Sequence, residues 1–384
     1  MRILHTGDWH IGKIINDFSL LEDQRYIFQQ LYQIIEEEKP DCIVIAGDIY
    51  DRSIPPKEAV LLLDEVLTTL CTKYKLPTLI ISGNHDSEER LSFGSKILEA
   101  SNLYIVGEIT QDIKKISLHD EYGVVNFYLL PYAHPIIVSN VFNEKIRDHD
   151  EAFGLIMSKL KENFDSEARN VLVTHNYIVT NPDDMLKSDS ERSISIGGTE
   201  YIDVNKVLDF DYVALGHLHK PQKVKEDYIR YSGSILKYSF SECDIDKGVV
   251  IVDIKEKGNI KIKMRTLTPL REMLILKGKL QELISPSTYE HINRDSYIRA
   301  DLTDTIDLYD PLSTLRAIYP NIMQIQRVIN LNQTTSRTKA SEGFQNKSKL
   351  DLFKEFYQEM TALSLDEDKE KAFIDILNEG EMDV

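Results

Sequence analysis

The sequence predicts an α/β protein in which two β-sheets are covered by helices, giving a four-layer α/β/β/α sandwich. Three observations lead to this fold class. Short apolar runs alternate with helical segments over the first hundred or so residues, as in layered α/β domains. Later apolar runs follow one another without helices between them, which favours a second, mixed sheet. Several of these runs end in Gly followed by Asp, Asn or His.

The first elements can be placed in order along the chain. Residues 1–6, MRILHT, are a predicted strand, and a helix over 19–38 follows and is ended by Pro40. A buried strand is predicted at CIVIAG, a helix from about Lys57 to Tyr74, and a third strand at PTLIISG. The later predicted strands are YIVG, GVVNFYLLP, NVLVTH, YVALGH, IRYSGS, GVVIVDI and IKIKMRTL.

The sequence changes character after about residue 265, which predicts several domains. Residues 1–265 form the main domain, and 266–330 are a small α/β unit with the order strand, helix, strand, helix, strand. Residues 331–347 are polar and are interpreted as a linker. Residues 348–384 hold two amphipathic helices that are too short to form a core of their own, which favours docking to a partner over packing back on the body.

Composition limits the function classes. The 384 residues carry a net charge of −18, which argues against holding nucleic acid through the overall field of the protein. Three widely spaced cysteines without a CxxC motif favour a reducing cytoplasm and argue against disulfides or structural zinc. Neither a membrane-spanning run nor a signal peptide is expected, so we predict no membrane association.

Polar residues recur where predicted strands end. Because the carboxyl ends of strands border the ligand crevice of an α/β sheet, such residues gather at one site. Each one alone has an ordinary explanation, as a turn residue or a structural histidine, but their joint occurrence favours a metal site. These strand-end residues are Asp8, His10, Asp48, Asp51, Asn84, His85, Asp86, His175, His217 and His219.

The types of ligand indicate the class of metal. Carboxylate, imidazole and amide oxygen donors without cysteine suit manganese- or iron-like divalent ions better than structural zinc. There are more donors than one ion needs, which predicts two ions that clamp the attacking and leaving oxygens of a phosphoryl displacement. Asp48, at the end of the middle strand, is the natural bridge between them.

The order DxH, GDxxDR, GNHD, H, GHxH resembles the calcineurin-like metallophosphoesterase superfamily. Within it, the strings GDIYDRSIPP, SGNHDS, GHLHKPQ and YSGSILKYSFSE resemble the SbcD nucleases, bacterial counterparts of the double-strand-break repair nucleases. The resemblance covers essentially the whole chain. It implies that residues 266–330 are a capping domain that helps to seat DNA.

The resemblance also implies the role of each site residue. One manganese ion would be held by Asp8, His10, Asp48 and His219, and the other by Asp48, Asn84, His175 and His217. His85 would stay off the metals and orient or protonate the leaving oxygen.

Several repair nucleases carry His at the position of Asp51. Here the string GDIYDR instead resembles the corresponding motif of the phosphoprotein phosphatases. Our hypothesis is that the Asp51 carboxylate hydrogen-bonds His85 and fixes its tautomer. Asp86 is an alternative for that role, but we expect it to hold the turn. Arg52 is a candidate phosphate contact, with a solvated surface arginine as the alternative. Further basic candidates for phosphate contacts are Lys13, Arg90, Lys220 and Lys237.

The resemblance implies a DNA nuclease that degrades duplex ends with 3′ to 5′ polarity and opens hairpins and single strands. No Walker A motif occurs in the chain, so any ATP dependence must come from a partner. The implied partner is an SbcC-type coiled-coil ATPase, bound through the C-terminal helices. A homodimer is expected through the helix that starts at Lys57, whose apolar surface is unusually wide. Two alternatives remain open: a phosphatase or phosphodiesterase acting on small phosphoesters, and a non-catalytic scaffold.

Overall fold

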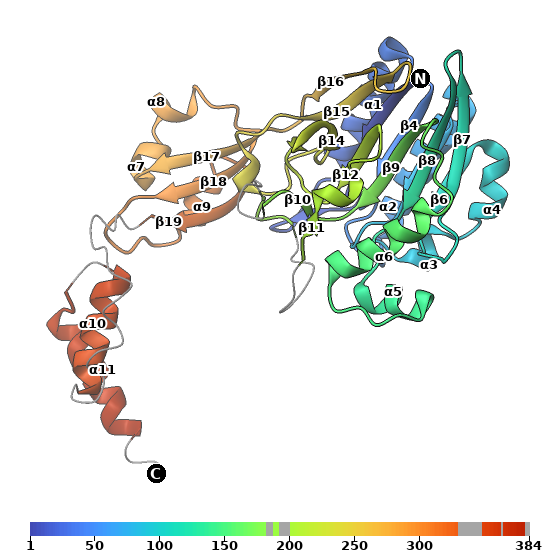
Figure 1. Ribbon diagram of the computed structural model, residues 1–384. Helices are drawn as coiled ribbons and strands as arrows, with labels where there is room; N and C mark the ends of the chain where they lie inside the picture. The colour runs from blue at the N-terminus through green and yellow to red at the C-terminus, as the bar shows by residue number, and fades with distance from the viewer. Residues whose placement is uncertain (182–186, 192–199, 329–347, 362–363, 381–384) are drawn as a thin grey trace. The chain divides into compact units, whose positions relative to one another are not determined.

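Two six-stranded β-sheets lie face to face in the first unit of the computed structural model, Met1–Leu274 (Figure 1). The structure describes residues 1–181, 187–191, 200–328, 348–361 and 364–380. In spatial order, the first sheet contains β16 (Ile260–Leu267), β15 (Lys247–Ile254), β1 (Arg2–Thr6), β4 (Cys42–Ala46), β5 (Thr78–Ile81) and β6 (Leu103–Val106). The second contains β13 (Gln222–Val224), β14 (Glu226–Tyr231), β12 (Tyr212–Gly216), β9 (Arg169–His175), β8 (Gly123–Leu130) and β7 (Lys115–Asp120).

Side chains that alternate along the strands divide between two apolar layers. Val44 and Ala46 of β4 point into the core between the sheets, together with Phe127 of β8. The next residue of β8, Tyr128, belongs instead to the layer beneath α6 (His149–Lys161). Each apolar side chain buried in this way contributes about 1.5–3 kcal/mol. The second sheet is therefore covered on both faces.

The outer face of the first sheet is covered by the helices that connect its parallel strands. β1, β4 and β5 run parallel, and their connections are α1 (Leu21–Glu38) and α2 (Lys57–Thr68). Right-handed crossovers place both helices on the same face. α1 buries Ile27, Phe28 and Leu31. This gives four layers, α/β/β/α, and confirms the predicted fold class.

The last two strands of the first unit, β15 and β16, do not belong to the second sheet, where the later strands were expected. β15 pairs antiparallel with β1, with Ile3 opposite Val252, so β15 and β16 extend the first sheet and not the second. The first helix begins at Leu21, because Phe18–Ser19 form a small strand with Ile14–Ile15.

The second unit, Ile275–Val384, holds a three-stranded sheet in the order β17 (Met273–Gly278), β18 (Tyr297–Leu302) and β19 (Ile322–Arg327), and the first two residues of β17 precede the unit boundary. The short helices α7 (Leu280–Leu283), α8 (Pro286–Tyr289) and α9 (Pro311–Arg316) lie between these strands in the sequence. The division from the first unit falls after Leu274, beyond the predicted boundary at 265. The intervening segment stays with the first unit through ion pairs such as Arg271–Asp23, at 2.8 Å.

Two antiparallel helices follow in the second unit, α10 (Lys349–Thr361) and α11 (Glu367–Gly380). Their seam is formed by Phe353 and Phe373, whose rings stack at 3.8 Å. A Lys354–Glu370 ion pair at 2.5 Å supports this contact. The linker predicted at 331–347 lies outside the described residues.

No helix among the described residues has both the length and the apolarity needed to cross a bilayer.

Candidate metal centre

The carboxyl ends of the two sheets meet at one edge of the first unit. β9 and β12 are parallel, with His175 beside Gly216 at their ends. The segments that follow β1 and β4 are joined by a hydrogen bond from the Asp8 amide to the Gly47 carbonyl, at 3.0 Å. The His217 amide donates to Asp8 Oδ1 at 2.9 Å and so ties the second sheet to the first. Side chains that follow five strands therefore converge on one place.

One cluster contains Asp8, His10 and His219, whose potential ligand atoms all lie within 4.8 Å of one another. All three residues are buried. The two Nε2 atoms of His10 and His219 are 3.0 Å apart, and His10 Nε2 lies 3.5 Å from Asp48 Oδ2. Donor atoms turned toward one another in this way are what a divalent cation requires.

A second cluster lies on the other side of Asp48 and contains Asp8, Asp48 and His175. His175 Nε2 is 3.5 Å from Asp48 Oδ2 and 3.0 Å from Asn84 Oδ1. His217 Nδ1 approaches the same Asn84 oxygen at 3.3 Å. The structure thus brings all seven predicted ligands together, and Asp48 faces both clusters. It also places Asp8, predicted for one ion only, within reach of the second cluster.

The His175 ring is fixed by a contact behind it. Its Nδ1 lies 2.8 Å from the Ala46 carbonyl oxygen, which can only accept, so Nδ1 carries the proton. Nε2 is then the nitrogen that faces Asp48 and Asn84, and it would bind a cation once its own proton is lost. A second hydrogen bond that fixes the tautomer in this way is typical of metal-binding histidines.

The electrostatics of the cluster also fit a cation. Burial opposes charge on His175, but the Asp48 carboxylate outweighs this effect and raises the pKa of His175 to about 9. Burial lowers the pKa of His10 and of His217 well below the ordinary value, and so keeps both rings neutral. Metals bind neutral imidazoles, so His10 and His217 are ready to bind a cation, whereas a cation at His175 would displace the proton that Asp48 favours there. Two divalent ions bound here would stabilise the attacking and leaving oxygens of a phosphoryl transfer.

Several predicted ligands have a strained backbone. The φ angles are 50° at Asp8, 43° at His10, 49° at Asp48 and 103° at His217. A residue other than glycine held in such a region costs about 1–3 kcal/mol, and these residues cluster at functional sites. The hydrogen bond from the His10 amide to the Asp48 carbonyl, at 2.9 Å, helps to hold this conformation.

Glycines allow the ligands to come this close. A Cβ atom on Gly83 would lie 2.1 Å from Asp48 Oδ1. One on Gly216 would lie 1.9 Å from the Ala46 carbonyl oxygen and 2.7 Å from His175 Nδ1. The glycine that precedes the polar residues in these motifs is therefore required by the packing of the site.

His85 lies beside the clusters and directs one nitrogen toward them. Its amide donates to Asp48 Oδ1 at 2.9 Å, and its Nε2 is 3.9 Å from Asp48 Oδ2. Its Nδ1 donates to the main-chain carbonyl of Asp51 at 2.8 Å. The hypothesis that the Asp51 carboxylate makes this contact is therefore wrong, although the residue is the expected one.

The conformation of the adjoining loop explains this difference. The Asp86 carboxylate accepts hydrogen bonds from the amides of Ile49, Tyr50 and Gly83, at 2.9–3.1 Å, and so holds the turn as expected. This attaches the loop after β4 to the GNHD turn and leaves the Asp51 carbonyl facing His85. The Asp51 carboxylate instead pairs with Lys13 Nζ at 2.8 Å.

The other basic candidates differ in their surroundings. The Arg52 side chain is half exposed, with Nη2 3.6 Å from Asp51 Oδ2 at the rim of the site. Lys237 is nearly buried and pairs with Glu272 at 2.5 Å, so it is not free for a phosphate. Arg90 is exposed, and Lys220 is partly buried.

Residues behind His219 were not identified from the sequence. The His219 amide donates to Glu191 Oε1 at 2.8 Å. Ser190 contacts His219 Nδ1, and Glu242 accepts from Ser190. Glu242 lies within the YSGSILKYSFSE string, which was the only available signal for it; Ser190 and Glu191 lie in a polar stretch without a motif.

The geometry agrees with comparisons with known proteins. Residues 1–221 match the family model of calcineurin-like phosphoesterases. The chain is 40% identical over 330 residues to the SbcD subunit of nuclease SbcCD from Staphylococcus epidermidis, and the match covers 86% of each chain. It is 38% identical over 326 residues to the same subunit from Staphylococcus saprophyticus, covering 85% of this chain and 84% of the relative. The chain belongs to the SbcD family of calcineurin-like phosphoesterases.

This membership confirms the resemblance seen in the sequence. A second family model, the SbcD_C model described as the type 5 capsule protein repressor C-terminal domain, matches residues 269–361. The SbcD family and the clustered ligands together identify a metal-dependent phosphodiesterase.

Replacing Gly83 by Ala should remove metal binding, because the new Cβ overlaps the Asp48 carboxylate. We expect the wild-type melting temperature to rise on addition of Mn²⁺, as it does for any ligand that binds only the folded state, and the Gly83→Ala variant to show no such rise. Gly258→Ala is the matched control, since it also adds a methyl group but in open space at φ +79°. It should be less stable by about 1 kcal/mol and still respond to Mn²⁺. A full Mn²⁺ response in Gly83→Ala would contradict this account of the site.

Proposed function

We propose that this chain is the manganese-dependent nuclease subunit of a complex with an SbcC-type ATPase. It would degrade duplex DNA ends from 3′ to 5′ and cut hairpins and single strands, in DNA repair, replication and recombination. The main support is the convergence of seven carboxylate, imidazole and amide donors from both sheets, with His85 beside them. The names of the two Staphylococcus relatives, which call them nucleases, support a nucleic acid substrate. We place its action in the bacterial cytoplasm, at the nucleoid.

The ligand roles follow from the two clusters. We assign Asp8, His10, Asp48 and His219 to one Mn²⁺ and Asp48, Asn84, His175 and His217 to the other. This is supported by the position of Asp48, whose Oδ2 is 3.5 Å from both His10 Nε2 and His175 Nε2.

His85 is the proposed proton donor to the leaving oxygen. With Nδ1 held by the Asp51 carbonyl, Nε2 is the nitrogen that faces the centre. General-acid catalysis of this kind typically contributes about 10²–10⁴-fold. Asp51 then acts by positioning: its carbonyl holds His85, and its carboxylate lies 3.9 Å from His10 Nδ1. Arg52, half exposed at the rim, is the proposed phosphate contact.

The alternative functions account for less of the chain. A phosphatase for small phosphoesters has no evident use for residues 266–330, which we propose to be the capping domain that seats DNA. A non-catalytic scaffold has no need of seven converging ligands, six of them buried, and of His85. The net charge of −18 is compatible with a DNA substrate if the partner supplies much of the phosphate binding.

The test is a nuclease assay with Mn²⁺ on linear duplex, hairpin and single-stranded DNA, compared with turnover of a small aryl phosphoester. We expect Mn²⁺-dependent loss of DNA, with and without the ATPase. His85→Gln should lower cleavage by at least about 10²-fold while the bound manganese, measured by atomic emission, stays at the wild-type level. Normal cleavage by this variant would refute the role of His85. Turnover of the small ester without any DNA cleavage would favour the phosphatase alternative.

We also propose a homodimer of this chain through α2. Val60 and Leu61 on this helix are 44% and 55% exposed, and Ile54 just before it is 67% exposed. A second copy of the same face is the proposed cover, since the opposite side of α2 already buries Ala59 and Leu62 in the core.

Leu61→Glu should convert the dimer to a monomer, because it would place a charge in the apolar interface. Sedimentation equilibrium at micromolar protein would show the halved mass. Ile136→Glu on α5 (Pro135–Phe142), where the side chain is 64% exposed, is the control and should stay dimeric. A monomeric wild type would rule out this interface.

The helices α10 and α11 are the proposed docking element for the ATPase. Apart from the Phe353–Phe373 seam, the pair leaves Phe356 and Ile376 exposed, at 58% and 65%. An apolar face on a helical pair is suited to bind a coiled-coil partner.

Phe356→Asp should weaken capture of the ATPase by at least about tenfold while Mn²⁺-dependent cleavage by the isolated nuclease chain is unchanged. The expected loss reflects burial of an aromatic anchor, whose truncation often exceeds about 2 kcal/mol. Ile306→Asp, at a side chain that is 68% exposed outside the helical pair, serves as the control. Equal capture of the Phe356→Asp variant, the control and the wild type would show that the ATPase binds elsewhere on the chain.

A further inference from the structure

A buried polar network lies behind His219. Its centre is Glu242, which is fully buried although it is neither a ligand nor part of the apolar core. Its Oε1 accepts hydrogen bonds from the hydroxyls of Ser188, Ser190 and Ser239, at 2.5, 2.6 and 3.1 Å. A buried carboxylate with so many donors holds its neighbours in fixed positions.

The Ser190 hydroxyl connects Glu242 to the His219 ring. Ser190 donates its only proton to Glu242 Oε1, because the carboxylate can only accept. At the 2.6 Å contact between Ser190 Oγ and His219 Nδ1, the ring nitrogen must then be the donor. His219 Nε2 is left with a lone pair, and this is the nitrogen that faces His10 in the first cluster.

Lys247 connects Glu242 to the main chain of His219. Its ammonium group lies 2.6 Å from Glu242 Oε2, 2.7 Å from the His219 carbonyl oxygen and 2.9 Å from Ser234 Oγ. These three contacts use all three donors of the ammonium group. Both the ring and the backbone of His219 are therefore held from the same carboxylate.

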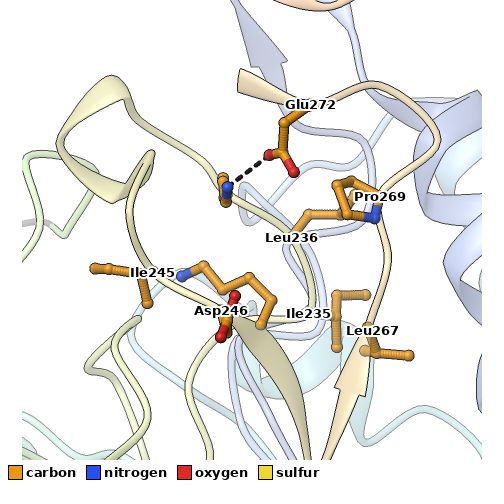
Figure 2. A pocket seen from close by; sticks show the side chains of 9 residues that line it. Ile235, Leu236, Ile245, Asp246, Leu267, Pro269 and Glu272 are labelled. Carbon is orange, nitrogen blue, oxygen red and sulfur yellow. Dashed lines mark hydrogen bonds and ion pairs between the residues drawn. The ribbon is translucent and has the colours of Figure 1, made fainter. Parts of the chain in front are cut away.

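A small cavity adjoins this network, and Figure 2 shows the residues that line it. Lys247 is part of the wall of the cavity, together with Lys237, Asp246 and Glu272. The carboxylate of Glu272 pairs with Lys237 at 2.5 Å, whereas Lys247 pairs with Glu242 at 2.6 Å. Two lysines of one cavity wall are thus paired separately, and only one of them reaches a proposed ligand.

We propose that Glu242 is a positioning residue that aims His219 into the metal centre, acting through the Ser190 hydroxyl and the Lys247 ammonium group. The inference rests on the proposed dimetal site and extends it to residues outside the ligand set. Contacts behind a metal-binding histidine typically change metal affinity by about 10–100-fold.

The test measures Mn²⁺ binding to the full chain by calorimetry and by electron paramagnetic resonance, without DNA. Ser190→Ala removes the hydroxyl that links Glu242 Oε1 to His219 Nδ1 and leaves the link through Lys247 in place. It should weaken one of the two Mn²⁺ sites by about 10–100-fold and replace the spectrum of a coupled manganese pair by that of a single ion. Ser190→Thr keeps a hydroxyl group and should restore both. Glu242→Gln should reproduce the loss, and Glu272→Gln, on the same cavity wall, should bind like the wild type.

Wild-type binding of both ions by Ser190→Ala would overturn the inference, even if Glu242→Gln fails to fold. Equal losses in Ser190→Ala and Ser190→Thr would also overturn it, since they would show a packing effect and no role for the hydroxyl. A wild type that binds two Mn²⁺ ions but does not cut DNA would refute the proposed substrate and leave this inference standing, so the two failures are distinguishable.

Discussion

Buried carboxylates and imidazoles from two facing sheets are held at one edge, and the rest of the molecule depends on that constraint. Asp8 and Asp48 are almost completely withdrawn from water, at 0% and 2% exposure. Unpaired charges in such surroundings are unfavourable by several kcal/mol each: burial raises the pKa of Asp8 well above its ordinary value, and charged Asp48 requires positive charge nearby. His175, with its pKa raised to about 9, supplies part of it; divalent cations are the compensation that the whole donor set fits. The burial that holds these carboxylates in place is therefore also the reason why they need bound cations.

The surrounding structure serves to keep these groups in place. The strained backbone at Asp8, His10 and Asp48 is held by main-chain hydrogen bonds between the loops, and that at His217 by the hydrogen bond from its amide to the Asp8 carboxylate. The glycines beside Asp48 and His217, Gly47 and Gly216, leave room that any side chain would fill. The His217 amide on Asp8 joins the two sheets at the same point. A phosphodiesterase needs its reacting groups in fixed positions before the substrate arrives, and this arrangement provides that rigidity.

The convergence of the seven proposed ligands could be predicted from the sequence, because each motif joins an apolar strand to the polar residues at its end. An apolar run, a glycine and then Asp, Asn or His mark the carboxyl ends of parallel strands, which must meet at one edge. The atoms that make each contact could not be predicted. Asp51 holds His85 through its carbonyl and not its carboxylate, because Asp86 fixes the loop between them. β15 pairs with β1 although the two strands lie at opposite ends of the first unit's sequence. Ser190, which joins Glu242 to His219, lies in a stretch without a motif. Only the folded chain reveals these contacts.

The central claim is that side chains scattered along the first unit hold two divalent ions together. Crystals of the protein grown with Mn²⁺ and measured at the manganese absorption edge test it most directly. The account predicts two anomalous peaks about 3.5–4 Å apart, one beside His10 and His219 and the other beside Asn84 and His175, with Asp48 between them. A single peak, or peaks away from these side chains in a folded protein with Mn²⁺ present, would contradict it.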